Sequence, residues 1–248
     1  MIDRLFSMGH ESPFEHASFT FGVSGVSRSL LAQITRHRIA SHSVQSQRYV
    51  RMNGGEYVTP QPIANNQYAL RIFEDHLEAC DRAYRDIVHY LMSEQLCAKY
   101  ADMLPKDNAH QTCGRDPKFG YLMLDSYFDS LKTKDEPSVE DDLLYAEYRK
   151  DRKAAEKYAI ENARAVLPNA SATQFVVTMN ARELMHFFSL RCCNRAQDEI
   201  RSLADEMLRL CKEVAPHMFA KAGASCVRGE CSEGPMCCGH PRTGGDEQ

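Results

Sequence analysis

The feature that most constrains the fold is a run of apolar side chains between residues 66 and 103, spaced three and four residues apart. The run consists of Leu70, Phe73, Leu77, Cys80, Tyr84, Ile87 and Leu91. Because an α-helix turns once every 3.6 residues, this spacing places all of them on one face. The sequence therefore predicts one long amphipathic helix whose apolar face points into a core.

Other segments predict a mixture of strands and further helices. Alternating apolar residues over 16–23 and β-branched residues over 173–178 predict two strands. Helices are expected over 27–38, 154–166 and 196–222, with another that begins near Asn180, while 39–46 is small and polar and is expected to be a loop. We therefore expect an α+β fold in which a single sheet is packed by long helices.

The region 104–155 differs in character from the rest. It is strongly charged, with apolar patches such as 121–124, and it resembles an insertion. Ser138 precedes several acidic residues and is expected to cap a helix. A lid, an oligomer contact and a surface excursion without function all stay open for this region.

Basic residues concentrate between residues 35 and 50. Arg36, His37, Arg38, Ser46 and Arg48 lie within thirteen residues of one another and are flanked by apolar residues. Guanidinium groups match phosphate and carboxylate geometry and keep their charge at physiological pH. A basic helix end that faces solvent is the alternative. The net charge of −4 argues against a nucleic-acid polymer as ligand, so the expected anion is small.

A second polar constellation comes from the C-terminal half. It consists of Arg164, Asn180, Arg182, His186 and Arg191. A ligand with several phosphates and planar rings, such as a dinucleotide, would use both constellations. Neither the glycine-rich dinucleotide fingerprint nor the P-loop pattern occurs, so the usual Rossmann and Walker sites are not supported.

The cysteines and the termini indicate the compartment. No apolar run approaches the roughly 20 residues that span a bilayer, and residues 1–7 lack the apolar centre of a signal peptide. We therefore expect a soluble cytoplasmic protein with reduced thiols and no membrane partner. The cluster Cys226, Cys231, Cys237, Cys238 and His240 could hold a metal, but a flexible reduced tail is the preferred interpretation and no metal is expected.

Several motifs together resemble one enzyme family. Arg36-His37-Arg38, followed after seven residues by Ser46, resembles the signature of flavin-dependent thymidylate synthases. The segments 9–16 (Gly-His-Glu-Ser-Pro-Phe-Glu-His), 161–168 and 178–184, then Arg191 and Ala196-Gln197, resemble other parts of that family in order and spacing. The resemblance covers about residues 8–100 and 156–223.

The resemblance implies a reaction and an assembly. Members of this family convert dUMP to dTMP, with 5,10-methylenetetrahydrofolate as one-carbon donor and NADPH as the reductant that acts through FAD. The family also implies a homotetramer whose active sites are shared between subunits, with dUMP and folate as its small-molecule partners.

The resemblance also implies the site residues. The flavin-contacting positions are Ser12, Arg36, His37, Arg38, Asn180, Arg182 and His186, with His10 near the flavin and folate rings. The nucleotide positions are Gln33, Arg36, Gln45, Ser46, Gln47, Arg48, Arg164 and Arg191. Arg191 corresponds to the catalytic residue that polarises the uracil. No cysteine nucleophile is required, and Ser46 is treated as a binding residue because no base is paired with it in the sequence.

The chain departs from the family pattern in three places. Val44 stands where many members have Glu, and His186 stands where Asn is common. The strand and helix that usually precede the Gly-His-Glu segment are not found, so a catalytically impaired flavin- or nucleotide-binding relative is the alternative function. The expected domains are 1–223, with the insertion at about 104–155, and a Cys-rich, flexible tail at 224–248.

Overall fold

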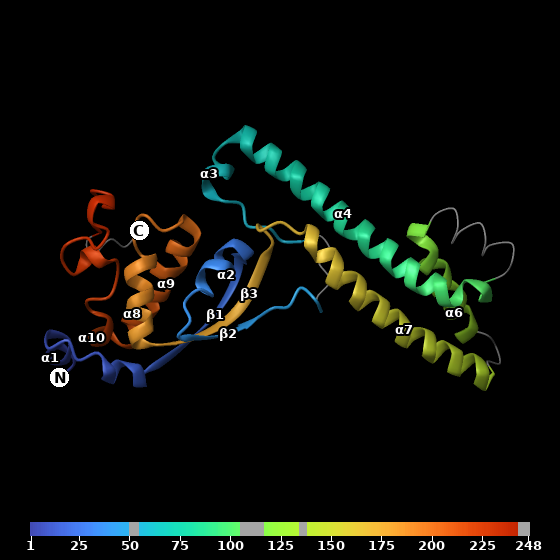
Figure 1. The fold of residues 1–248 in the computed structure, drawn as a ribbon, viewed down its shortest axis with the longest axis horizontal. Coiled ribbons are helices and arrows are strands. Elements are labelled where there is room, and N and C mark those ends of the chain that lie inside the picture. The colour runs from blue at the N-terminus through green and yellow to red at the C-terminus, as the bar shows by residue number, and fades with distance from the viewer. Residues whose placement is uncertain (50–54, 105–116, 134–137, 243–248) are drawn as a thin grey trace. The chain divides into compact units, whose positions relative to one another are not determined.

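The computed structural model describes residues 1–49, 55–104, 117–133 and 138–242 (Figure 1). The chain forms two compact units. Unit 1 holds residues 1–45, 56–60 and 169–248, and unit 2 holds residues 46–55 and 61–168. Residues 224–242 belong to unit 1, and the expected boundary at 223 stays a prediction.

Unit 1 contains a three-stranded antiparallel sheet, which confirms the expected α+β class. Its strands β1 (Ser18–Ser27), β3 (Ala172–Asn180) and β2 (Ala40–Val44) are arranged in the order β1-β3-β2. In the register of β1 and β3, Phe21 lies opposite Val177. The register shifts between Val23 and Val26, where Gly25 adopts a φ of +70° that an L side chain rarely tolerates.

The conformation of residues 40–44, in the middle of the basic stretch, differs from the prediction. Residues 39–46 were expected to be a loop, but Ala40–Val44 forms β2, with Ala40 opposite Met179 and Val44 opposite Phe175. Small polar residues carry little strand propensity of their own. The unpaired edge of β3 supplies the backbone hydrogen bonds, so tertiary pairing decides the conformation.

Helices of unit 1 pack on this sheet and on one another. They are α1 (Ile2–Ser7), η1 (Ser12–His16), α2 (Arg28–Ile34), α8 (Ala181–Arg191), α9 (Asp198–Val214), α10 (Pro216–Phe219), η5 (Ser225–Val227) and η6 (Gly234–Met236). Their core joins Val177 of β3 to Phe187 and Phe188 of α8 and to Ile200 of α9, all of them fully buried.

Two helices are shorter than predicted. Helix α2 is capped by Ser27, whose Oγ accepts a hydrogen bond from the Leu30 N–H at 3.1 Å, but it ends at Ile34 rather than at residue 38. Helix α9 ends at Val214 instead of reaching residue 222. Pro216 lacks an N–H and its ring excludes the helical conformation before it, so a separate short helix, α10, follows.

Unit 2 is helical, and the long helix predicted over 66–103 is confirmed as α4 (Gln67–Tyr100). Asn66 caps it, since its Oδ1 accepts hydrogen bonds from the N–H groups of Tyr68 and Ala69. The other elements are α3 (Gln61–Ala64), η2 (Ala101–Met103), η3 (Pro117–Phe119), α6 (Gly120–Lys132), α7 (Val139–Ala163) and η4 (Arg164–Val166).

The described part of region 104–155 contributes to the core of unit 2. Phe128 of α6 is fully buried and stacks on Tyr148 of α7, with ring centroids 3.9 Å apart. Both residues belong to one apolar cluster with the buried face of α4. A surface excursion is therefore excluded. The predicted cap at Ser138 is confirmed by a capping box with Asp141, and the helix expected over 154–166 is the end of the longer α7.

No helix among the described residues is long and apolar enough to cross a membrane.

Candidate active site

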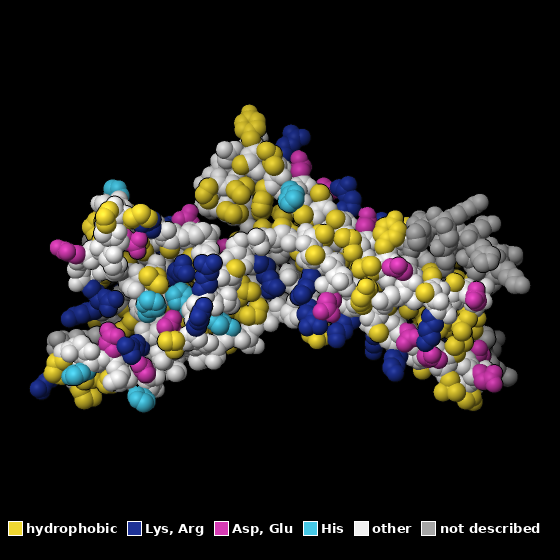
Figure 2. Space-filling view, in the orientation of Figure 1, with side chains coloured by type: hydrophobic (Ala, Val, Ile, Leu, Met, Phe, Trp, Pro, Cys, Tyr) yellow, Lys and Arg dark blue, Asp and Glu magenta, His cyan; other side chains and the backbone are white. Residues whose placement is uncertain are grey.

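The polar residues of unit 1 gather where β3 turns into α8. Asn180 ends the strand and caps the helix, because its Oδ1 accepts a hydrogen bond from the Glu183 N–H at 2.8 Å. Helical spacing then places Arg182 and His186 on the exposed face of α8, and Glu183 and Phe187 on its buried face. Figure 2 shows basic and histidine side chains together on the face of unit 1 that carries α2, β2 and α8.

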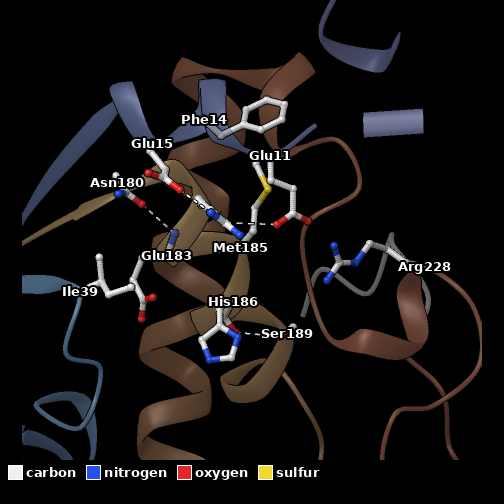
Figure 3. Close-up of a pocket in the computed structure, with 11 residues that line it drawn as sticks. Glu11, Phe14, Glu15, Ile39, Asn180, Glu183, Met185, His186, Ser189 and Arg228 are labelled. Carbon is white, nitrogen blue, oxygen red and sulfur yellow. Dashed lines mark hydrogen bonds and ion pairs between the residues drawn. The ribbon is translucent and has the colours of Figure 1, made fainter. Parts of the chain in front are cut away.

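A cavity of about 570 Å³ opens at this place. Its lining residues are Glu11, Phe14, Glu15, Ile39, Asn180, Arg182, Glu183, Met185, His186, Ser189 and Arg228 (Figure 3). They come from η1 and the residue before it, from the segment between α2 and β2, from the end of β3, from α8 and from the C-terminal segment. Its volume lies in the range of small-molecule sites, which is roughly 300–1,000 Å³.

Two carboxylates hold Arg182 at the cavity. Its Nε lies 3.3 Å from Oε2 of Glu11, and its terminal nitrogen contacts Oε1 of Glu15. Glu15 is the main cause of the raised pKa of Arg182. All three side chains are about half exposed, so these pairs orient the guanidinium more than they stabilise the fold.

His37 is buried beside the same helix. Its Nδ1 lies 3.1 Å from Oε1 of Glu183, and Nε of Arg191 donates to its Nε2 at 3.3 Å. The ring of Phe187 packs against it at an interplanar angle of 79°, with centroids 4.9 Å apart. Burial lowers the pKa of His37 below the ordinary value, although its hydrogen bond with Glu183 opposes this shift.

Arg191 and Arg36 repel each other electrostatically. Burial lowers the pKa of Arg191, and the charge of Arg36 lowers it further. Arg36 and Arg38 are themselves exposed, beyond the end of α2. A bound anion would relieve this repulsion, so the geometry favours a negatively charged ligand near Arg191.

The expected nucleotide residues of unit 1 also include two glutamines. Nε2 of Gln33 donates to Oε1 of Gln197 at 3.1 Å. The backbone of Gln45 continues the pairing of β2, since its N–H donates to the Gln174 carbonyl at 3.0 Å.

The other expected nucleotide residues lie in unit 2. Oγ of Ser46 accepts a hydrogen bond from the Arg48 N–H at 3.1 Å, and Gln47 follows it in a turn. Nε of Arg48 lies 2.7 Å from Oε1 of Glu161, whose hydrogen bond raises the pKa of Arg48. Arg164 is exposed at the first position of η4.

The structure thus brings part of the predicted cofactor set together. Asn180, Arg182 and His186 line the cavity, whereas His37 is not among the lining residues and contacts one of them, Glu183. Ser12 and His10 are exposed neighbours of Glu11 in the chain and are not among the lining residues.

Sequence analysis missed four charged residues of the cavity. Glu11 and Glu15 appeared in the sequence analysis only as letters of the 9–16 motif, with no role given to either carboxylate. Glu183 could have been found, because it stands four residues before Phe187 on the apolar face of α8. Arg228 carries no sequence signal, since it lies beyond the region of family resemblance.

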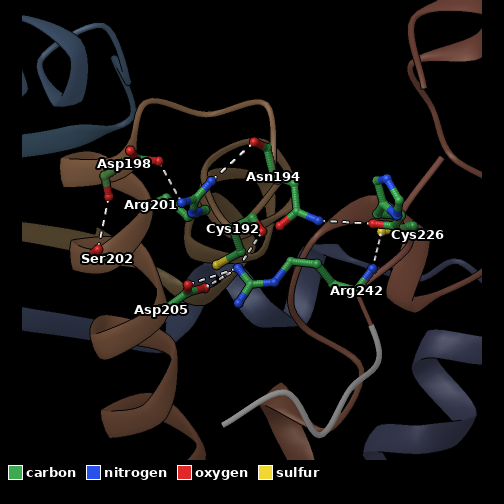
Figure 4. Close-up of polar contacts among 9 residues, drawn as sticks. Cys192, Asn194, Asp198, Arg201, Ser202, Asp205, Cys226 and Arg242 are labelled. Carbon is green, nitrogen blue, oxygen red and sulfur yellow. Dashed lines mark hydrogen bonds and ion pairs between the residues drawn. The ribbon is translucent and has the colours of Figure 1, made fainter. Parts of the chain in front are cut away.

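The C-terminal segment makes several polar contacts with the rest of unit 1; the flexible tail expected from the sequence stays a prediction. The guanidinium of Arg242 contacts both carboxylate oxygens of Asp205, at 2.9 and 2.8 Å, and the carbonyl of Cys192 at 2.7 Å (Figure 4). Asn194 donates to the carbonyl of His240. These contacts fix the segment that carries Arg228 to the cavity, where Figure 3 shows the side chain reaching in opposite His186.

Comparisons with known proteins agree on one family. The family model described as "Thymidylate synthase complementing protein" matches residues 1–217. A flavin-dependent thymidylate synthase of Clostridium tetani is 43% identical over 238 residues, which are 96% of this chain and 76% of the relative. Proteins of the same name from Geobacter sulfurreducens (40% identical, 96% of this chain and 75% of the relative) and Pyrococcus horikoshii (32%, 94% and 72%) are also similar.

Proposed function

The chain belongs to the family of flavin-dependent thymidylate synthases, and from that premise we propose that it methylates dUMP to dTMP. In this proposal, 5,10-methylenetetrahydrofolate donates the carbon, NADPH is the reductant, and FAD is the bound cofactor. The observation that carries the proposal is the cavity at α8, because expected flavin residues of this family line it together.

The residues of the cavity suit a flavin. Phe14, Ile39 and Met185 offer apolar surface to planar rings, and Asn180 with His186 offers polar groups around them. Arg182 and Arg228 supply positive charge for phosphates. When bound, FAD would supply the hydride chemistry, while the protein would bind and orient the reactants.

Arg191 is the proposed catalytic residue. Uracil becomes nucleophilic at C5 when negative charge on its carbonyl oxygens is stabilised, and a fixed guanidinium does this without giving up a proton. The pKa of Arg191 is lowered by burial and by Arg36, so a ligand that gains negative charge there is favoured. Arg48 and Arg164 are proposed to bind the phosphate of dUMP, with the hydroxyl of Ser46 as a further donor. Gln33, Gln45 and Gln47 are proposed as other nucleotide-binding residues.

The buried thiols support a mechanism without a cysteine nucleophile. Cys192 directly follows Arg191, but burial raises the pKa of its thiol far above neutral pH. Burial also raises the pKa of Cys211 to about 12. A raised pKa favours the protonated thiol, which is a poor nucleophile.

The proposal is tested on the purified chain. It should be yellow, or should become yellow on addition of FAD, and should form dTMP from dUMP, methylenetetrahydrofolate and NADPH, measured by chromatography. A colourless protein that takes up no FAD would contradict the proposal and favour an impaired relative, an alternative that the named relatives do not support. We further propose that the enzyme is a cytoplasmic homotetramer, which light scattering during gel filtration would test for its mass.

A further inference from the structure

A carboxylate, an imidazole and a guanidinium form a chain of contacts inside unit 1. Glu183 and Arg191 lie eight residues apart on α8, and His37, from the segment after α2, contacts both. The side chains of His37 and Glu183 are only 5% and 8% exposed, so water screens their interaction weakly. The order of contacts is Glu183 to His37 to Arg191.

The chemistry of the three groups determines where the protons lie. Every nitrogen of a guanidinium is a donor, so the Arg191 Nε–H must donate and His37 Nε2 must accept. The imidazole therefore carries its proton on Nδ1, which donates to the Glu183 carboxylate at 3.1 Å. With one proton on Nδ1 and a free lone pair on Nε2, His37 is neutral in this arrangement, in agreement with the lowered pKa of the buried imidazole.

We propose that Glu183 is a positioning residue which acts through His37 to hold the Arg191 guanidinium in its reactive orientation. This inference rests on the proposed function. Arg191 has several rotatable bonds, and its Nε is engaged by His37, which directs its terminal NH2 groups toward a ligand. Glu183 selects the tautomer of His37 that can accept this hydrogen bond.

The location of Glu183 argues against a purely structural role. Its neighbours on the buried face of α8 are apolar, among them Leu184, Phe187 and Phe188, and each is fully buried. A buried carboxylate carries a desolvation cost that an apolar residue at the same position would avoid. The geometry indicates a role in positioning, because the carboxylate of Glu183 contacts the imidazole that accepts a hydrogen bond from Arg191.

The test compares Glu183→Gln and Glu183→Met with the wild type in single-turnover formation of dTMP. The change to glutamine keeps a hydrogen-bond acceptor and removes the charge, whereas the change to methionine removes both. We expect the rate to fall about 10-fold in E183Q and about 100-fold in E183M, with the KM for dUMP changed less than about twofold. FAD uptake and thermal unfolding confirm that each variant is folded, and E183Q keeps the test usable if E183M fails to fold.

The pH profile separates positioning from stability. The charged groups that face His37 are Glu183, Arg191 and, at 6.1 Å between ring centroids, His186 of α8, with Arg36 beside Arg191. Protonation of His37 at Nε2 removes the acceptor for Arg191, so the rate of dTMP formation should fall as the pH drops below the pKa of His37. The Glu183 carboxylate favours that protonation, and its loss should shift the acid limb to lower pH in E183Q.

The matched control is Glu199→Gln. Glu199 is a partly buried glutamate of the same unit whose carboxylate accepts hydrogen bonds from the N–H and Oγ of Ser27, at 2.6 and 2.5 Å. E199Q should keep the wild-type acid limb. The proposal is overturned if E183Q turns over like the wild type, or if its rate falls with an unshifted acid limb. If the wild type itself forms no dTMP, the proposed function fails instead.

Discussion

The guanidinium groups of this protein have different roles because their surroundings differ. Arg191 is partly buried, contacts a neutral imidazole and has a lowered pKa. Arg182 is about half exposed and lies between two carboxylates. The first is poised for a ligand that gains negative charge, whereas the second is held in place by charges of the protein itself.

Replacing Arg191 tests this distinction. Arg191→Ala should lower the rate of dTMP formation about 100-fold or more, because it removes a donor aimed at developing negative charge. FAD should still bind, since Arg191 does not line the cavity. Arg191→Lys is the matched control: it keeps the charge without the planar fork, and we expect only a small recovery. Turnover of the alanine variant at the wild-type rate would refute the catalytic role.

At the scale of elements, α6 is a helix with a buried apolar face inside a region whose overall composition is charged. One face of this helix is buried against the C-terminal half of α4, where Tyr84, Val88, Met92 and Leu96 face the same core. The residues of that face are Tyr121, Leu124, Phe128 and Leu131. The charged residues of α6, Asp125, Asp129 and Lys132, lie off this face, and the acidic stretch before α7 adds further charge, so the average composition of the region conceals its apolar stripe. The segment stabilises unit 2, whatever further role it has.

Removing one ring from this cluster should destabilise the protein. Phe128→Ala deletes a fully buried side chain that stacks on Tyr148, and large cavities in cores cost about 3–5 kcal/mol. The free energy of unfolding, measured in urea, should fall by that amount. Leu122→Ala on the same helix is the control, because Leu122 is 44% exposed and its loss should cost little. Equal effects of the two changes would contradict the assignment of α6 to the core.

The C-terminal segment can be tested in the same way. Arg242→Gln removes the two-oxygen contact with Asp205 and should loosen the segment that carries Arg228. We expect FAD to bind several-fold more weakly in this variant and in Arg228→Gln, measured by flavin fluorescence. Lys221→Gln is the control: it also removes one positive charge, but from an exposed residue elsewhere, and it should leave the FAD affinity unaltered. Unchanged FAD affinity in both variants would mean that the segment does not contribute to the site.

At the scale of the whole molecule, the expected nucleotide residues are divided between the two units. Gln33, Arg36, Gln45 and Arg191 belong to unit 1, while Ser46, Gln47, Arg48 and Arg164 belong to unit 2. If active sites are shared between subunits, as the family resemblance implies, a single chain need not complete a site. Oligomerisation would then be a condition of catalysis.

Mixing inactive variants would test shared sites. Arg48→Ala and Arg191→Ala should each be inactive alone because each lacks one expected nucleotide contact. If the sites combine residues of different chains, tetramers assembled from both variants contain some complete sites and should regain part of the activity. Arg191→Ala mixed with Arg191→Lys is the control, since that mixture completes no site. Absence of recovery in exchanged, tetrameric mixtures would indicate that each chain supplies both residues.

The sequence by itself determined the elements whose signals are local. The long helix α4, the cap at Ser138 and the strand β3 follow from periodicity, from β-branched residues and from a side chain that contacts its own backbone within a few residues. The motifs around residues 36–48 and 178–191 were enough to identify the family, which the comparisons confirmed.

The tertiary structure decided everything that depends on partners distant in the chain. Segment 40–44 becomes a strand only because β3 offers an unpaired edge, and α6 becomes core only because α4 presents an apolar stripe. The contact of Glu183 with His37 joins residues 146 positions apart, and neither neighbourhood in the sequence signals it. Burial lowers the pKa of His37 in that pair. Burial arises only when the chain folds, so it cannot be read from neighbouring residues in the sequence.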